Sequence, residues 1–129
     1  MHKRATPLTP LELQIMEVLW EIGPASVQAV QQRLDHLAYT TVHTMLNVLV
    51  RKKRVKRTEK ERAHIYRAAI SRGEIVQQTV KDVVDKLFGG SSAQLMMNVM
   101  DARDLTADDV ARLRKRLHEL NDEISGDAE

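Results

Sequence analysis

The sequence predicts a mostly α-helical protein that carries a single β-hairpin near the middle of its 129 residues. Two observations support this fold class. Apolar residues recur at helical spacing through most of the chain, and the period changes to alternation at residues 55–68. Hydrophobic residues make up 43% and charged residues 29%, which is typical of a folded domain. Aromatic residues amount to only 3%, so we expect a core of Leu, Val, Ile and Met.

The first helix is expected at residues 9–22. Thr9 is a suitable N-cap, Pro10 suits the first helical position, and Glu12 completes a capping box. Apolar residues follow at helical spacing until Gly23-Pro24 ends the helix.

Two further short helices are expected before residue 54. Ser26 can cap a second helix that continues to about residue 37. After a break at Ala38-Tyr39, a third helix is predicted from Thr40 to Lys53.

A two-stranded β-hairpin is predicted after the third helix. Residues alternate from Val55 to Glu59 and again from Ile65 to Ala68, on either side of a polar tip at residues 59–62. Three helices followed by a hairpin is the order of elements in a winged helix-turn-helix domain.

The remainder of the chain is expected to form three more helices. A long fourth helix from Ile75 to Phe88 is ended by Gly89-Gly90, and a short fifth helix starts at Ser91 or Ser92. Thr106 begins the sixth helix, with Asp109 as its capping partner. The final residues, 125–129, are expected to form a frayed acidic tail.

These C-terminal helices favour association with a second copy of the chain. The apolar residues of the sixth helix follow a regular 3, 4, 3, 4 spacing, which is typical of a coiled-coil seam. Three helices over about fifty residues bury a thin core when isolated. The alternative is an intramolecular bundle in a monomer. The expected dimerisation residues are Val76, Val80, Val83, Leu87, Leu95, Val110, Leu113, Leu117, Leu120 and Ile124.

Charge divides the chain into two parts. Residues 1–72 hold 13 Lys/Arg and 6 Asp/Glu, a net charge of +7, whereas residues 73–129 hold 7 and 12, a net charge of −5. The basic part is expected to meet a polyanion. We therefore expect a winged-helix DNA-binding domain at 1–72 and a helical dimerisation domain at 73–129.

The third helix has a polar side suited to nucleic acid. At about 100° per residue its apolar residues share one side, and Thr40, Thr44, Asn47 and Arg51 lie opposite. Hydroxyl, amide and guanidinium groups can contact base edges and phosphates. Six cations follow within residues 51–57, as expected for phosphate contacts. The alternative for such a helix on its own is a solvated amphipathic surface.

Residues spread over the first half of the chain carry a resemblance to a known family. They are Leu8-Thr9, Glu12, Ile15-Met16, Leu19-Trp20, Gly23, Ser26-Val27, Tyr39, Thr41-Val42, Thr44-Met45-Leu46, Leu49 and Tyr66. Together they resemble the penicillinase/methicillin-resistance repressor family of winged-helix transcriptional regulators (BlaI/MecI type). The resemblance spans residues 8–68, whereas residues 70–124 match mainly in helical layout.

The resemblance implies a dimeric repressor that binds an inverted-repeat operator in double-stranded DNA. It places Thr40, Thr41 and Thr44 where the family's recognition helix meets the operator, and Arg62 where its wing carries an arginine. It also implies relief of repression by proteolysis at Asn98-Val99, with a membrane sensor-protease as a partner. The residues and the resemblance together predict DNA contacts at Thr40, Thr41, Thr44, Asn47, Arg51, Lys60 and Arg62.

The chain departs from the family pattern at four places. Lys53 stands where members often have glycine at the end of the recognition helix, and Val48 replaces a frequent arginine. Residues 59–62 lack the usual wing glycine, and Val99 stands where the family usually has Phe. These departures bear on the wing's shape, the operator sequence and cleavage.

Several classes of function are excluded or disfavoured. The absence of cysteine rules out disulfides, zinc-thiolate sites, iron–sulfur clusters and thiol catalysis, and it removes the cysteine ligands of the family's copper-responsive relatives. The five histidines show no metal-binding spacing, so we expect neither metal nor cofactor, and an enzyme is disfavoured. No apolar run is long enough to span a membrane or to serve as a signal peptide, so a cytoplasmic protein is expected.

One alternative function remains open on the sequence alone. A winged helix can be a protein-interaction module that uses its hairpin as a docking edge and does not read DNA sequence. Such a module would have no need of the cations between Arg51 and Arg57.

Overall fold

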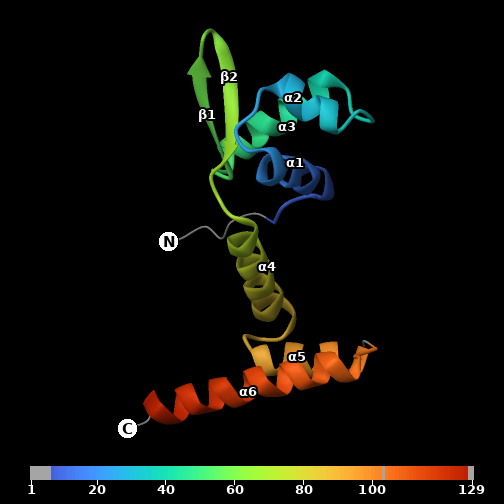
Figure 1. The fold of residues 1–129 in the computed structure, drawn as a ribbon, viewed down its shortest axis with the longest axis vertical. Coiled ribbons are helices and arrows are strands. Elements are labelled where there is room, and N and C mark those ends of the chain that lie inside the picture. The colour runs from blue at the N-terminus through green and yellow to red at the C-terminus, as the bar shows by residue number, and fades with distance from the viewer. Residues whose placement is uncertain (1–6, 103, 128–129) are drawn as a thin grey trace. The chain divides into compact units, whose positions relative to one another are not determined.

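The computed structural model describes residues 7–102 and 104–127 (Figure 1). Its elements are α1 (Pro10–Ile22), α2 (Val27–Arg33), α3 (Tyr39–Arg51), β1 (Val55–Lys60), β2 (Ala63–Ala68), α4 (Arg72–Leu87), α5 (Ser92–Ala102) and α6 (Ala107–Asp127). The predicted fold class, three helices, a two-stranded hairpin and three further helices, is confirmed. The chain divides into two compact units, residues 1–82 and 83–129, so the division falls within α4.

The capping box predicted for α1 is present. The Thr9 hydroxyl accepts a hydrogen bond from the Glu12 N–H at 3.2 Å, and Glu12 Oε1 accepts one from the Thr9 N–H at 2.9 Å. Pro10 is the first helical residue, and Gly23 ends the helix with φ +81°. The reciprocal bonds satisfy two backbone donors at the helix N-terminus and hold the Glu12 carboxylate inward.

The predicted end of α2 is wrong. Ser26 caps the helix as expected, because its hydroxyl accepts a hydrogen bond from the Ala29 N–H at 3.1 Å. The helix then ends at Arg33 rather than near residue 37, because Leu34 leaves the helical conformation (φ −126°, ψ 59°). The Leu34 side chain is buried in the core. The helix therefore ends because of tertiary packing, without the Gly or Pro that usually marks a helix end in the sequence.

The third helix is one residue earlier at its start and two residues earlier at its end than predicted. α3 begins at Tyr39, after an Ala38 N-cap that makes no side-chain bond. Lys53 has a left-handed backbone with φ +63°. The N–H groups of Lys53 and Arg54 donate to the carbonyls of Val50 and Leu49, which is the pattern of a Schellman motif.

The hairpin is longer than predicted and its turn is tighter. β1 and β2 are antiparallel and pair from Val55↔Ala68 to Lys60↔Ala63. The turn therefore consists of Glu61 and Arg62, which have φ +50° and +68°. Two consecutive positive φ angles fit a type I′ turn, whose twist matches that of the strands.

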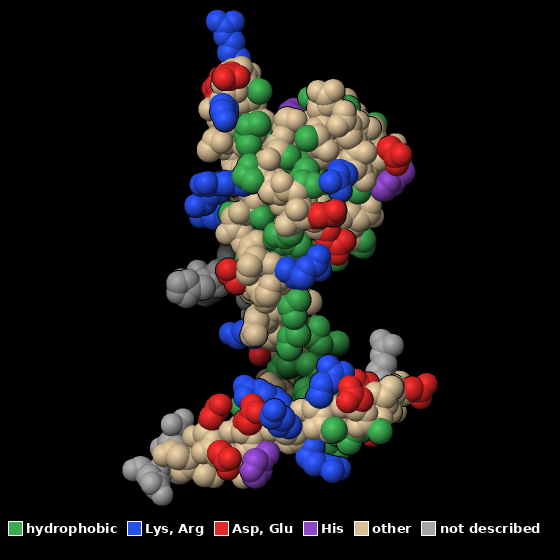
Figure 2. Space-filling model, in the orientation of Figure 1, with side chains coloured by type: hydrophobic (Ala, Val, Ile, Leu, Met, Phe, Trp, Pro, Cys, Tyr) green, Lys and Arg blue, Asp and Glu red, His purple; other side chains and the backbone are tan. Residues whose placement is uncertain are grey.

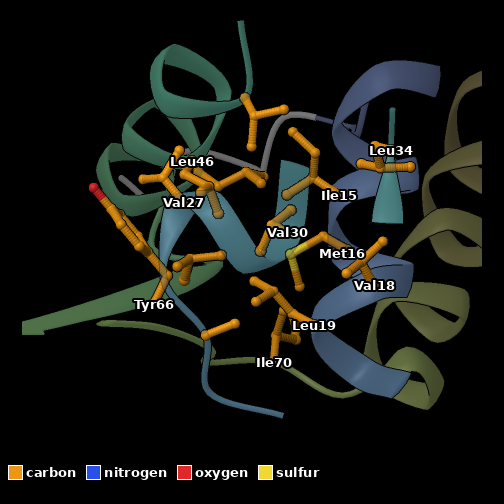
Figure 3. Packing of buried hydrophobic residues seen from close by; sticks show 14 of the residues in the cluster. Ile15, Met16, Val18, Leu19, Val27, Val30, Leu34, Leu46, Tyr66 and Ile70 are labelled. Carbon is orange, nitrogen blue, oxygen red and sulfur yellow. The ribbon is translucent and has the colours of Figure 1, made fainter. Parts of the chain in front are cut away.

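The core of the first unit consists mainly of aliphatic residues and methionine, as predicted, together with one buried tyrosine (Figure 3). Most of these residues come from α1, α2 and α3, and Val55, Ile70 and Ile75 extend the cluster to β1 and the start of α4. Tyr66 on β2 is fully buried, and Figure 3 shows it at one edge of the cluster. Its backbone N–H and C=O exchange hydrogen bonds of 2.8 and 2.9 Å with Ala25 in the connection between α1 and α2. This bridge fixes the hairpin to the helical core.

The second unit contains the C-terminal end of α4 with α5 and α6. Gly89 and Gly90 end α4 with φ +57° and +88°, and the Ser91 hydroxyl accepts a hydrogen bond from the Gln94 N–H at 3.1 Å. Thr106 and Asp109 form the expected reciprocal cap of α6. α6 continues to Asp127, so the expectation of a frayed tail is wrong for residues 125–127, and residues 128–129 lie outside the described part.

The helices of this second unit leave much apolar surface uncovered within one chain. The exposed apolar side chains of residues 83–127 include Leu87, Met96, Met97, Val99, Met100, Val110, Leu117, Leu120 and Ile124. Leu117 is 56% exposed and Ile124 is 67% exposed. Among the helices described, none has the length and apolar character needed to cross a lipid bilayer.

Candidate nucleic-acid interface

α3 presents one apolar and one polar side, as the sequence predicts. Val42, Leu46 and Leu49 are completely buried against the rest of the winged helix. Thr40, Thr44 and Arg51 are exposed, whereas Thr41 and Asn47 are half-buried. We call the group Thr40, Thr44, Asn47 and Arg51 the recognition face. Because its apolar side is fixed in the core, α3 holds this face toward solvent.

A shallow open depression of about 480 Å³ lies beside the recognition face. Its lining residues come from α3 and from β1: His43, Thr44, Asn47, Val50, Arg51 and Arg57. Arg51 and Arg57 place two guanidinium groups at this surface, where both residues are exposed. The depression thus combines hydroxyl, amide and cationic groups, which suits contact with phosphates and base edges.

Asn47 lies at the junction of α3 and the hairpin. Its side-chain oxygen accepts hydrogen bonds from Arg57 Nη1 at 2.6 Å and from the Tyr66 hydroxyl at 3.4 Å. Its side-chain nitrogen donates to the His43 carbonyl at 2.9 Å. Arg57 and Tyr66 could not be predicted as partners of this amide from the sequence, because their approach depends on how the hairpin packs on α3.

Two cations of the basic segment have structural roles. Lys52 Nζ lies 2.9 and 3.0 Å from the two carboxylate oxygens of Glu12. Glu12 is buried, with only 1% of its surface exposed. Arg54 is buried, and its Nη1 donates to the Gln78 side-chain oxygen at 3.0 Å. The expectation that all six cations are available for phosphates is therefore wrong.

The other four cations of this fully described segment are exposed. They are Arg51, Lys53, Lys56 and Arg57. Arg51 and Arg57 line the depression beside the recognition face, whereas Lys53 and Lys56 line a second depression around Val55. A polyanion that reached α3 would therefore meet Arg51 and Arg57.

The environment of Glu12 affects its protonation. Burial raises the pKa of this carboxyl, but the hydrogen bonds from Lys52 and Thr9 and the positive charge of Lys52 outweigh burial. The net result is a pKa below the ordinary value of 4.5. The carboxylate therefore stays charged and ties the start of α1 to the end of α3.

The hairpin, which we call the wing, carries cations at its end. Lys60 is the last residue of β1, Arg62 is the second turn residue, and both are exposed. Figure 2 shows Lys and Arg side chains at the tip of the hairpin. In the described part of the chain, no three His, Asp or Glu residues gather into a potential metal site.

An aromatic pair lies at the start of α3. The rings of Tyr39 and His43 are stacked, with centroids 6.5 Å apart and an interplanar angle of 14°. The predicted helix began at Thr40 and so excluded Tyr39. The four-residue spacing of Tyr39 and His43 is the signal that indicates a shared helical face.

The proposed cleavage point lies within a helix. Asn98 and Val99 are in the middle of α5, and the Asn98 side chain donates to the Gln94 carbonyl at 2.9 Å. Both residues are exposed. A protease that cut this peptide bond would have to unwind α5 locally.

A winged helix whose third helix has a polar side flanked by cations is typical of a DNA-binding transcriptional regulator. The family model described as penicillinase repressor matches residues 8–119, so the chain belongs to the penicillinase repressor family. This is a family of transcriptional repressors, not of enzymes.

Curated relatives agree with this family, and a solved structure shares the fold. The chain is 25% identical over 126 residues to the penicillinase repressor of Staphylococcus aureus, covering 94% of this chain and 98% of the relative. It is 33% identical over 121 residues to the transcriptional regulator BlaI of Mycobacterium tuberculosis, covering 91% and 87%. A MarR mutant from E. coli, solved in complex with operator DNA, matches with a TM-score of 0.50 and 21% identity, covering 88% and 75%, and this likeness shows the fold alone.

Proposed function

We propose that this repressor acts as a homodimer and binds an inverted-repeat operator in double-stranded DNA through α3 and the wing. The observation that carries the proposal is the polar side of α3 with the exposed guanidinium groups of Arg51 and Arg57 beside it. A helix of this kind can enter the major groove while neighbouring cations contact the phosphate backbone.

The recognition helix supplies the contacts to bases in this proposal. Thr40, Thr41 and Thr44 lie on or beside the outward side of α3, where a hydroxyl and a methyl group can meet base edges. Arg51, at the end of α3, can contact guanine or phosphate.

The wing supplies contacts to the backbone. Lys60 and Arg62 lie at the exposed end of the hairpin, away from the buried base of β1 at Val55. A two-residue turn keeps both cations at the extremity of the wing. We assign them to phosphates that flank the major-groove site.

Homodimerisation is supported by the apolar surface of α4, α5 and α6. Val76, Val80 and Leu87 on α4 and Leu117 and Ile124 on α6 are large apolar residues exposed in the single chain. Exposed apolar residues in such number are typical of protein–protein interfaces, and each of the two units contributes some of them. A two-fold dimer would present two recognition helices about 34 Å apart, one turn of DNA, or a multiple of it.

We propose further that cleavage near Asn98-Val99 relieves repression, with a membrane sensor-protease as the partner. The resemblance to the BlaI/MecI family supports this, and the cut would separate α6 from the DNA-binding domain. A chain truncated after Asn98 should lose dimerisation and bind operator more weakly. If it dimerised and bound as tightly as the full chain, this mechanism would be wrong.

The competing function is a winged-helix module that binds a protein and does not read DNA. Titration of a random duplex with the full chain at several salt concentrations separates the two. The repressor should bind with log affinity falling steeply as log salt rises, because cations release counterions from DNA. No binding at low salt, or a flat slope, would favour the interaction module.

A further inference from the structure

The amide of Asn47 is already engaged by the wing in the free protein. Arg57 and Tyr66 are direct cross-strand partners in the hairpin register. Directly opposite residues share one face of a two-stranded sheet. Both donate to the same atom, Asn47 Oδ1, at 2.6 and 3.4 Å.

This arrangement conflicts with base recognition by Asn47. An asparagine that recognises adenine uses its carbonyl oxygen as an acceptor and its amide nitrogen as a donor at the same time. The oxygen has two lone pairs, and here it receives two donors. The nitrogen already donates to the His43 carbonyl. Pairing with adenine would therefore require Asn47 to release its contacts with the wing.

The same contacts orient Arg57. Its guanidinium group carries five N–H donors, and Asn47 receives one of them. Arg57 is exposed and lines the depression together with Thr44 and Arg51. A guanidinium held in this way can present its other donors to a phosphate in the bidentate geometry that arginine favours.

Tyr66 makes this a rigid attachment. Its ring is fully buried, and both its backbone N–H and its backbone C=O form hydrogen bonds with Ala25. The strand that carries Tyr66 is therefore anchored to the core, and Asn47 joins α3 to both strands of the hairpin. The distance between the recognition face and the tip of the wing depends on this junction.

We propose that Asn47 is a positioning residue and that Arg57, which it orients, is a further phosphate-contacting residue at the base of the wing. The proposal rests on the DNA-binding function proposed above and deepens it. Asn47 selects no base, and its effect on DNA affinity is exerted through Arg57 and the wing.

The test compares Asn47→Ala, Arg57→Ala and the double variant in the full chain, using a duplex selected from random sequence and a scrambled duplex. Arg57→Ala should weaken binding to both duplexes by a similar factor, about tenfold, and lower the salt slope by about one. Asn47→Ala should also weaken binding to both duplexes by a similar factor. The double variant should bind no more weakly than Arg57→Ala alone. Both substitutions remove the same phosphate contact, because Asn47 acts through Arg57.

Base preference gives the second measurement. Site selection with Asn47→Ala should return the same preferred base at every operator position as the unsubstituted chain. Tyr66→Phe removes the longer of the two hydrogen bonds to Asn47 and keeps the buried ring, so it should weaken both duplexes less than Asn47→Ala does, because Arg57 keeps its bond to Asn47. Thermal unfolding of each variant verifies that it is folded.

Two results would overturn the proposal. One is loss of a preference for adenine at a single position in Asn47→Ala, and the other is additive losses in the double variant. Failure of the unsubstituted chain to bind either duplex at low salt would instead overturn the proposed DNA-binding function itself, so the two failures are distinguishable.

Discussion

Three described residues other than glycine have a left-handed backbone conformation. They are Lys53 after α3 and Glu61 and Arg62 in the wing turn, all with positive φ. The backbone at these three positions is therefore one that their side chains disfavour. A left-handed residue with a Cβ costs about 1–2 kcal/mol.

Lys53→Gly is therefore expected to raise the free energy of unfolding of the winged helix by about 1 kcal/mol. The Schellman bonds at the end of α3 need this backbone, and glycine adopts it without strain. The measurement is the urea midpoint of the full chain. Lys53→Ala, which removes the charge and keeps the Cβ, is the control and should give no such gain. A lower stability for Lys53→Gly would contradict this explanation.

The ion pair of Glu12 with Lys52 predicts a pH dependence of stability. The pKa of Glu12 is lowered in the folded chain, so the unfolded chain binds protons more readily as the pH falls. The stabilisation is fully present above the ordinary value of 4.5 and is lost as the pH falls through the lower folded pKa.

Glu12→Gln should lower the stability by about 2 kcal/mol at neutral pH, with the difference from the unsubstituted chain shrinking below about pH 4. Urea unfolding at a series of pH values measures this difference. Glu59→Gln, which removes an exposed carboxylate on β1, is the control. A difference that stayed constant down to pH 2.5 would show that the ion pair does not carry the effect.

Among the elements, α3 and the wing are expected to make different contacts with DNA: α3 contacts bases, and the wing contacts phosphates. The recognition face lies on a helix whose other side is fixed in the core, whereas the wing projects its cations from a two-residue turn. Base contacts confer specificity, and phosphate contacts confer affinity without specificity.

Thr44→Ala should lower the ratio of operator affinity to random-duplex affinity, by about 1 kcal/mol in discrimination. Lys60→Ala should weaken both duplexes by a similar factor, because a phosphate contact is independent of sequence. Fluorescence anisotropy at one salt concentration compares the two. Equal effects of both variants on both duplexes would contradict the assignment of the recognition face.

The elements that the sequence predicted well are those with local causes. The capping boxes at Thr9 and Thr106 and the glycines after α4 act within a few residues, and all were found as expected. The end of α2 at Leu34 and the burial of Arg54 depend on contacts with distant residues. Helical periodicity and charge counting contain no information about those contacts.

The candidate site shows the same division. The outward side of α3 follows from its apolar side, because side chains opposite a buried stripe must face solvent. The engagement of Asn47 does not follow, because it needs the register that sets Arg57 opposite Tyr66 and the packing of that pair on α3.

The whole molecule joins a basic winged helix to an acidic helical part that is proposed to dimerise. The apolar residues expected at the seam of α6 include Val110, Leu117, Leu120 and Ile124, and each is exposed in the single chain. Two linked binding sites gain affinity because the second contact becomes intramolecular.

Leu117→Asp should convert the dimer into a monomer, because a buried carboxylate at an apolar seam is costly. Since Leu117 is exposed within one chain, the substitution should leave the helical content unchanged. Light scattering after size-exclusion chromatography gives the mass, and operator affinity should fall by about 100-fold or more. Lys115→Ala on the same helix is the control. A Leu117→Asp chain that remained dimeric would contradict the assigned seam.

Dimeric recognition of an inverted repeat is tested most directly by selection of binding sites from random duplexes by the full-length chain, followed by measurement of stoichiometry on the selected duplex. We expect an inverted repeat whose half-sites are one turn of DNA apart, about 10 base pairs, or a multiple of it, bound by two chains. Enrichment of no sequence, or of a single half-site bound by one chain, would contradict it.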